Sequence, residues 1–323
     1  MDTLEWRAPL SALDHTSHQG AAGCSVFQME FTRHLHEHYF AGQTAEFFAS
    51  PEYQNALNEH LYARTERFGR HLAPWISTAF DLSGANVLEI GSGTGALTAV
   101  FAPLAEQITC FDTDERSLRA ARRRAELMGW RNVEFAGEFG PCCHFVTEER
   151  KADAAIFVGV VEHLDFPTFE SLVGTAWRAL RPGGVLIVAD TPNRLCTFDY
   201  HSAWLPFFQW LPDDVRRRYY ERSPRHQLVH DLVDFKKQGL ESVSARLQSW
   251  GNGVSFHDFE LVLGPQVHDW IVADGWSEHI YPLASVFPDD RALLAMFEDP
   301  HYQIRAHRGW ARSWLYLIFR KPT

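Results

Sequence analysis

Three glycines at alternate positions, Gly91, Gly93 and Gly95, follow the apolar run VLEI at residues 87–90. Glycine tolerates positive φ and lets a ligand approach the main chain closely. A strand that turns on glycines into the start of a helix places backbone N–H groups where a nucleotide-type ligand can bind. Asp112 ends the next apolar run, ITCFD, and its carboxylate could accept from both hydroxyls of a ribose. These residues predict a nucleotide-type site.

Two histidines are of the type and placement suited to proton transfer. His163 lies in VVEHL, directly after the apolar run AAIFVGV, and His201 lies in TFDYHSAW, two residues after Asp199. Histidine is the side chain best matched to general-base catalysis near neutral pH. We hypothesise that one of them deprotonates an acceptor, or that both orient it. A hydrogen-bonded structural histidine is the alternative for each.

The run HLHEH raises the question of a metal site. On a helix only His34 and His38 share a face, with Glu30 one turn earlier. Histidines on an amphipathic helix more often pack or face solvent, and we therefore expect no metal in this protein.

Residues 195–254 are rich in aromatic residues, prolines and arginines. A long insertion of this kind in an α/β domain is usually a lid or a substrate-binding element. Its aromatic rings could wall a ring-containing or lipid-like acceptor, and its arginines could hold a carboxylate or a phosphate. Ordinary lid packing with a solvated basic face is the alternative. The residues that we assign to substrate binding are Asp199, Trp204, Phe207, Arg217 and Arg218.

Strand and helix patterns alternate through the middle of the chain. Apolar runs predict strands at residues 87–90, 108–112, 133–137, 154–160, 184–190, 279–286 and 311–321. Helical spacing predicts helices from Ala96, over 117–129 and over 167–179, and an N-terminal helical segment over 27–79 with Ser50 as an N-cap. Such alternation is typical of βαβ units and a parallel sheet, with the last strand antiparallel.

We therefore expect an α/β fold, a Rossmann-like doubly wound sheet of seven mostly parallel strands. The predicted organisation is a tail and helical cap (1–80), a nucleotide-binding core (81–194), a lid insertion (195–254) and the C-terminal part of the core sheet (255–323).

Five motifs occur in the order VLEIGSGTG, CFDTD, FAGE, ADAAIFVGVVEHL and LRPGGVLIVADTPNR. Together they resemble the ordered motifs of class I S-adenosylmethionine-dependent methyltransferases, over roughly residues 86–194. The chain is most similar to the small-molecule methyltransferases that carry EHL after the fourth strand. The resemblance implies S-adenosyl-L-methionine as cofactor and methyl transfer to a small acceptor, at oxygen rather than at nitrogen or carbon.

The resemblance also implies roles for individual residues. The glycines would let the methionyl part of the cofactor lie against the backbone, Glu89 would position its ammonium group, and Asp112 would hold the ribose. Glu138 would accept from the adenine amino group. The complete predicted cofactor set is Glu89, Gly91, Ser92, Gly93, Gly95, Asp112, Thr113, Glu138, Phe139, Phe157 and Val158.

Several of these assignments have structural alternatives. Asp112, followed by Asp114, could simply cap the next helix, and Glu138 could be an exposed loop acid. The following stretch, GPCCHFVTEERK, departs from the acidic loop with proline that is usual in the family. Its adjacent cysteines, Cys142 and Cys143, could be redox-active, although a free cysteine is ordinarily a small buried hydrophobe.

Composition limits the partners. The 323 residues carry 30 basic and 41 acidic side chains, a formal charge of −11, which argues against a general binder of nucleic-acid phosphates. No apolar stretch reaches the roughly 18 residues of a membrane span. The first twenty residues lack the pattern of a signal peptide, and five cysteines without CxxC fit reduced thiols. We therefore expect a cytoplasmic protein; its oligomeric state stays open.

Two rival functions remain. GSGTGA also fits the dinucleotide fingerprint GxGxxA, so an NAD(P)-dependent oxidoreductase on the same fold is possible. LRPGG, EHL and the absence of a Tyr-x-x-x-Lys pair after the fourth strand argue against it. The third hypothesis is a non-catalytic scaffold subunit that binds the cofactor without turnover.

Overall fold

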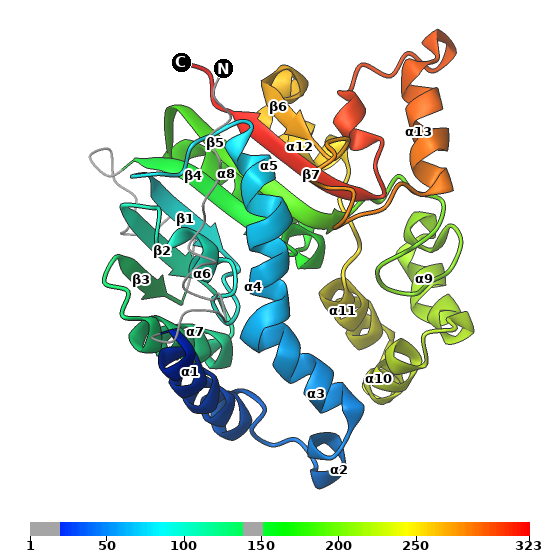
Figure 1. Ribbon diagram of the computed structural model, residues 1–323. Coiled ribbons are helices and arrows are strands. Elements are labelled where there is room, and N and C mark those ends of the chain that lie inside the picture. Colours follow the sequence, from blue (N-terminus) through cyan, green and yellow to red (C-terminus); the bar gives the residue numbers. More distant parts are fainter. Residues whose placement is uncertain (1–19, 138–150) are drawn as a thin grey trace. The chain divides into compact units, whose positions relative to one another are not determined.

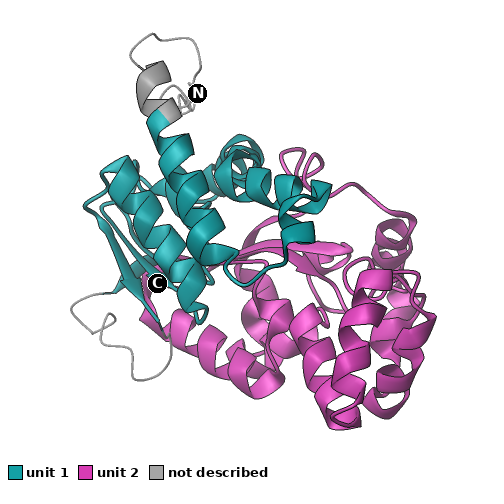
Figure 2. Ribbon diagram, turned by 90° about the horizontal axis from the view of Figure 1, so that it is seen from below, with its two compact units in different colours: residues 1–156 teal, residues 157–323 magenta. Residues whose placement is uncertain are grey.

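The computed structural model describes residues 20–137 and 151–323. The chain divides into two compact units, residues 1–156 and residues 157–323 (Figure 2). No helix in the described parts combines the length and the apolar character that a membrane crossing requires.

A seven-stranded sheet runs through the fold in the order β3-β2-β1-β4-β5-β7-β6 (Figure 1). Strands β1, β2 and β3 are parallel to one another, whereas β7 pairs antiparallel with β5 and β6. The strands are β1 (Asn86–Ile90), β2 (Gln107–Phe111), β3 (Val133–Ala136), β4 (Ala152–Val158), β5 (Leu180–Pro192), β6 (Ile271–Asp274) and β7 (Trp314–Arg320). The predicted α/β class with a mostly parallel, Rossmann-like sheet is confirmed.

The N-terminal segment of the first unit is helical, as predicted. The hydroxyl of Ser50 accepts from the backbone N–H of Tyr53 at 3.2 Å, and Pro51 occupies the first turn. From there a nearly continuous helix runs to Ser77, with π-helical turns at residues 59–63 and 68–72. Its α-helical parts and the preceding helices are α1 (Gly20–His34), α2 (Ala45–Phe48), α3 (Pro51–Asn58), α4 (Arg64–Arg67) and α5 (Ala73–Ser77).

Helix α7 (Glu115–Met128) links this segment to the loop after β1. Arg124 of α7 is almost fully buried; its Nε donates to the carbonyl of Thr94 at 2.9 Å, and its guanidinium lies 4.4 Å from the ring centre of Phe31. Helix α6 (Thr98–Phe101) is only one turn long, and it begins later than the helix predicted from Ala96.

Two helices of the second unit pack together beside the strands. Phe259 of α12 (Phe256–Leu263) contacts Phe169 of α8 (Phe166–Ala179) and Phe319 of β7, with ring centres 5.0 and 5.4 Å apart.

Helix α13 (Pro288–Glu298) contributes Asp290, which forms a fully buried ion pair with Arg312 at 3.1 Å.

The insertion predicted over residues 195–254 folds around a small core of its own. Its helices are α9 (Asp213–Tyr219), α10 (His226–Lys236) and α11 (Leu240–Trp250). The core consists of Ala203, Phe208, Tyr220, Leu228, Leu232, Val243 and Leu247, all of them buried. These helices therefore form a packed element rather than an extended loop.

One predicted strand is wrong. Residues 279–286 form turns, and the sixth strand lies earlier, at Ile271–Asp274. Ile280 and Ala284 are buried although their segment is not a strand, so the apolar run reflects burial without strand pairing.

Candidate functional site

The loop after β1 adopts the turn that its glycines permit. The angle φ is +76° at Gly91, +54° at Gly93 and +78° at Gly95. A Cβ atom added at Gly93 would meet no atom of the described residues within 4 Å, so the main chain there borders open space. The backbone N–H of Gly91 donates to the carbonyl of Phe111 at 2.7 Å, which ties the loop to β2.

Asp112 is joined to this loop and is not the cap of the next helix. Its Oδ2 accepts from the N–H of Gly93 at 2.7 Å, and its Oδ1 accepts from the N–H of Asp114 at 2.8 Å. The N-cap of α7 is Asp114, which accepts from the N–H of Arg116 at 3.1 Å. The two aspartates therefore have separate tasks, and Asp112 belongs to the glycine loop.

Glu89 places a buried carboxyl at the end of β1. Its side chain is 4 % exposed and accepts from the hydroxyl of Thr98 at 2.7 Å. Burial raises its pKa to about 7, because the charged form loses its hydration; the hydrogen bonds from Thr98 and Cys110 oppose the shift. At neutral pH, Glu89 can therefore change its charge when a cation approaches.

The remaining predicted cofactor residues are scattered. Ser92 is buried and Thr113 is exposed. Phe157 is fully buried in β4, Val158 ends that strand, and both belong to the second unit. Glu138 and Phe139, like Cys142 and Cys143, lie outside the described residues.

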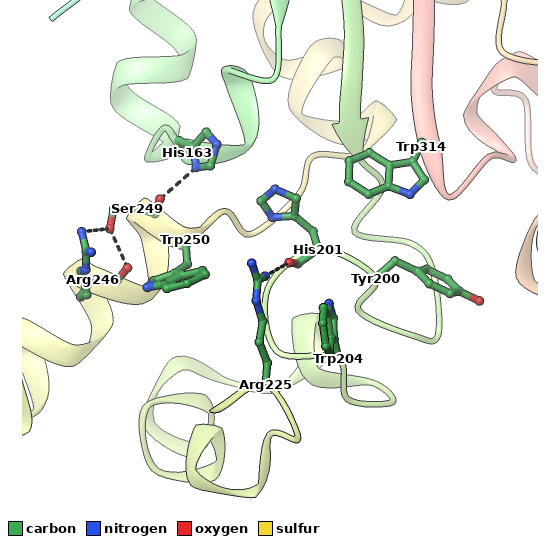
Figure 3. A pocket seen from close by; sticks show the side chains of 9 residues that line it. All are labelled: His163, Tyr200, His201, Trp204, Arg225, Arg246, Ser249, Trp250 and Trp314. Carbon is green, nitrogen blue, oxygen red and sulfur yellow. Dashed lines mark hydrogen bonds between the residues drawn. The ribbon is translucent and has the colours of Figure 1, made fainter. Parts of the chain in front are cut away.

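A separate pocket of about 420 Å³ lies in the second unit (Figure 3). Seven of its nine lining residues come from the predicted insertion, one from the turn after β4 and one from β7. They are His163, Tyr200, His201, Trp204, Arg225, Arg246, Ser249, Trp250 and Trp314. The predicted insertion therefore forms most of the wall of a pocket with the volume of a small-molecule site.

Both predicted histidines lie in this pocket, with ring centres 5.6 Å apart. Nδ1 of His163 lies 3.0 Å from the carbonyl oxygen of Ser249. Since a carbonyl can only accept, this nitrogen carries the proton and Nε2 offers a lone pair. Nδ1 of His201 lies 3.3 Å from the hydroxyl of Ser202, which itself donates to the carbonyl of Gly251. The hydroxyl therefore accepts from His201, which leaves Nε2 of that ring unprotonated as well.

Asp199 organises the loop that carries His201. Its buried carboxylate accepts from the backbone N–H groups of His201, Ser202 and Ala203, at 3.0, 2.8 and 2.7 Å. The next residue, Trp204, lines the pocket with φ at +53°, an unusual backbone conformation for a bulky side chain. Asp199 thus holds the pocket wall without lining it.

The other predicted substrate-binding residues do not line the pocket. Phe207 is 51 % exposed, Arg218 is exposed, and Arg217 forms an ion pair with Glu241. Of the five predicted substrate-binding residues only Trp204 lines the pocket, and the arginines that line it, Arg225 and Arg246, come from positions farther along the insertion.

Residues 87–184 match a family model described as a methyltransferase domain. The chain is also 31 % identical, over 129 residues, to a probable S-adenosylmethionine-dependent methyltransferase of Mycolicibacterium smegmatis; the match covers 40 % of this chain and 46 % of the relative. Residues 87–184 therefore carry a methyltransferase domain of the class I S-adenosylmethionine-dependent type. S-adenosylmethionine is the cofactor of this family.

The chain is also similar to proteins whose names give different methyl-accepting atoms, oxygen in one and nitrogen in the other. A ubiquinone biosynthesis O-methyltransferase of a Methylobacterium species is 29 % identical over 132 residues, which cover 39 % of this chain and 51 % of the relative. The structure of the N-methyltransferase NodS from Bradyrhizobium japonicum aligns over 91 % of this chain and 100 % of its own, at 14 % identity and a TM-score of 0.40, too low to bear on function. The chain spans about half the length of these two curated relatives.

The electrostatics of the pocket favour neutral imidazoles. Burial lowers the pKa of His201 to about 4; the nearby charges of His163 and Arg225 act in the same direction, and Asp199 opposes them. Burial also lowers the pKa of His163. The Glu162 carboxyl beside them is 1 % exposed, and burial raises its pKa to about 8. At pH 7 the cluster is therefore mostly uncharged.

Three side chains of types that bind metals lie close together beside the pocket, outside the HLHEH run in which the sequence suggested a metal site. One ligand atom each from Glu162, His163 and His201 lies within 4.8 Å of the others, a spacing that could accommodate a cation. In HLHEH, the rings of His34 and His38 are 4.7 Å apart. The third member of that stripe, Glu30, accepts from Arg33 at 2.6 Å and from Arg123 at 3.1 Å, so arginines already occupy its carboxylate.

Eight residues that line or support the pocket are absent from the predicted site residues: Tyr200, Arg225, Arg246, Ser249, Trp250 and Trp314 line it, and Glu162 and Gly251 lie beside its histidines. Glu162 carried a signal, because it precedes the selected His163 in VVEHL. Ser249, Trp250 and Trp314 carried none, since they reach the pocket only through the folding of α11 and β7. Gly251, at the end of α11, is in contact with His201.

Proposed function

We propose that the chain transfers a methyl group from S-adenosylmethionine to an oxygen atom of a small-molecule acceptor, with His163 or His201 as general base. The observation that carries this proposal is the pocket of about 420 Å³ in which two neutral imidazoles and three indoles meet. Its volume lies within the range of small-molecule sites. A histidine with a free lone pair is the group that an oxygen acceptor needs.

The glycine loop supplies a donor and acceptor set that fits the cofactor. The open main chain at Gly93 leaves room for a ligand where a side chain would intrude. The carboxylate of Asp112 retains acceptor capacity beyond its two backbone bonds, since a carboxylate offers about four lone-pair sites. Glu89 would favour an ammonium group, because a nearby positive charge stabilises its ionised form.

The chain's own residues then bring about the reaction by positioning and proton removal. When bound, the cofactor supplies an electrophilic methyl group on a sulfonium sulfur. Nε2 of His163 or His201 would accept the hydroxyl proton of the acceptor, and the tryptophans would hold its apolar part and exclude water. Holding two reactants in line accounts for a large share of such a rate enhancement, with effective molarities on the order of 10⁵ M or more.

Cofactor binding is the first test. Isothermal titration with S-adenosylmethionine, S-adenosylhomocysteine and NADH should show micromolar binding of the first two. Release of S-adenosylhomocysteine during a screen of hydroxylated acceptors should then identify substrates, and the mass of the product together with its NMR spectrum should place the methyl group on oxygen. Binding of NADH instead would favour the hypothesis of an NAD(P)-dependent oxidoreductase. Cofactor binding without transfer to any acceptor would favour the scaffold hypothesis.

The general base is tested separately, by replacing each histidine with alanine and with asparagine. Single-turnover transfer with an acceptor found in the screen should fall by about 10²-fold to 10⁴-fold in the variants of the base. Unchanged rates in all four variants would show that neither histidine takes the proton.

A further inference from the structure

Arg225 lies in the pocket between two indole rings. It stands directly before α10, and its guanidinium carbon is 5.2 Å from the ring centre of Trp204 and 4.6 Å from that of Trp250. Figure 3 shows its side chain between these two tryptophans and directed toward His201. One of its nitrogens, Nη1, donates to the backbone carbonyls of His201 and Ser202.

The charge of Arg225 is not neutralised by an ion pair with any of the described residues. No carboxylate oxygen of the described residues lies within 4.0 Å of its guanidinium, and its Nε and Nη2 make no hydrogen bond to them. Asp199 is the nearby acid, but four N–H donors already surround its carboxylate. Nε and Nη2 form one edge of the planar guanidinium, and that edge is free to receive two oxygen atoms side by side.

The rest of the pocket gives this charge no counterion. The nine lining residues include two arginines and no aspartate or glutamate. The second arginine, Arg246, already forms an ion pair with Asp231, with N–O distances of 2.6 and 3.1 Å. Arg225 is therefore the pocket's uncompensated cation, and it is partly removed from water, which strengthens its attraction for an anion.

We propose that Arg225 binds an oxyanion of the methyl acceptor, a carboxylate or a phosphate carried by a ring that packs against the neighbouring indoles. The substrate class is thus a ring-containing hydroxy acid or phosphate ester. This inference rests on the proposed function in taking the pocket as the acceptor site, but it makes a statement about binding alone. The Nε–Nη2 edge matches the two oxygens of a carboxylate, and the same edge can hold two oxygens of a phosphate.

The test is binding of three small probes to the 323-residue chain without cofactor. Benzoate and phenyl phosphate present the two oxyanions on the same ring, and benzyl alcohol is their neutral counterpart. Ligand-observed NMR at millimolar probe concentration should show that at least one anion binds and that it binds more tightly than benzyl alcohol. In Arg225→Gln that preference should fall roughly tenfold to a hundredfold, the usual effect of losing hydrogen bonds to a charged group. The stronger of the two anions identifies the acceptor's group.

The matched control is Arg222→Gln, an identical change at an exposed arginine of the same insertion that does not line the pocket. This variant should retain the anion preference. Because Arg225 also bonds to two carbonyls, Arg225→Lys tests the charge with less risk to folding; it should keep part of the preference, and a thermal melt checks each variant. Equal binding of benzyl alcohol, no binding of either anion, or equal losses in both glutamine variants would overturn the proposal.

This binding result is independent of methyl transfer. If the anion preference depends on Arg225 but no acceptor is methylated, the proposed function fails and the anion site stands. If the cofactor binds and methyl transfer occurs but the anions bind no more tightly than benzyl alcohol, the proposed function stands and the anion site fails.

Discussion

Gly251 lies against the imidazole ring of His201. A Cβ atom added to Gly251 would be 2.7 Å from Cε1 and 2.8 Å from Nδ1 of His201, closer than real Cβ contacts occur. The glycine ends α11, and its φ of +100° already disfavours any larger residue. The position of His201, one of the two candidate bases, thus depends on the absence of a methyl group at the residue that caps α11.

Gly251→Ala should therefore displace His201 and lower single-turnover transfer by about 10²-fold, because small displacements of a reacting group are costly. The matched control is Gly239→Ala at the other end of α11. Gly239 has a φ of +118° and no neighbouring atom within 4 Å of an added Cβ, so it has the backbone strain without the collision. Both variants should lose stability in urea unfolding. Equal activities in the two would show that the contact with His201 is not important.

If His201 is the base, the transfer rate should fall on acidification only at a pH well below the ordinary pKa of histidine. Burial lowers the pKa of His201 to about 4, so the ring stays unprotonated as the pH falls through 6.5, and the activity should decline only as the pH approaches 4. The unfolded chain takes up its protons near pH 6.5, so stability also falls between about 6.5 and 4. Single-turnover rates from pH 4 to 8, each with the folded fraction measured by circular dichroism, separate the two effects. A fall in the transfer rate centred at pH 6.5, in protein that is still fully folded, would contradict a role for His201 as base.

Glu162 should make the protein less stable at alkaline pH. Burial raises its folded-state pKa to about 8, whereas in the unfolded chain it ionises near pH 4.3. The folded state therefore binds more protons between these values, so stability falls as the pH rises through this window and levels off above about 8. Glu162→Gln should reduce the loss of unfolding free energy between pH 6 and pH 9 in urea titrations. Glu170→Gln, at an exposed site, should leave that loss as it is in the wild type.

Asp112 and Asp114 offer a matched pair for the cofactor site. Asp112→Ala should lower the affinity for S-adenosylmethionine roughly tenfold to a hundredfold, since it removes a charged acceptor from the loop. Asp114→Ala removes the N-cap of α7 and should cost about 1 kcal/mol of stability with little change in affinity. Calorimetric titration and thermal unfolding of both variants check this. Similar affinities for the two would remove Asp112 from the proposed site.

The sheet could be predicted because its strands are buried runs that alternate with helical patterns. Val87, Ile108 and Val185 all lie in strands where the sequence analysis placed them, and all are buried. Strand β6 could not be predicted in the same way, because it pairs only with β7 and its residues are only partly buried or exposed. An edge strand of this kind lacks the continuous apolar run that marks a central one.

The reactive residues of the pocket could be predicted only where their immediate neighbours in the sequence identify them. His163 and His201 could be selected because each follows a strand at a position where ligands bind in such folds. Arg217 and Arg225 could not be told apart by type, since what distinguishes them is the ion pair that only Arg217 makes. A carboxylate partner fixed by folding, and not the residue's own identity, decides which arginine can meet a ligand.

The separate core of the insertion has an evolutionary consequence. Its buried side chains, from Ala203 to Leu247, pack among themselves, whereas the glycine loop belongs to the other compact unit. Mutations in this core can thereby change much of the pocket wall without altering the glycine loop or Asp112. Under the proposed function, the preference for one acceptor over another can therefore evolve through substitutions within a single helical module while the glycine loop stays the same.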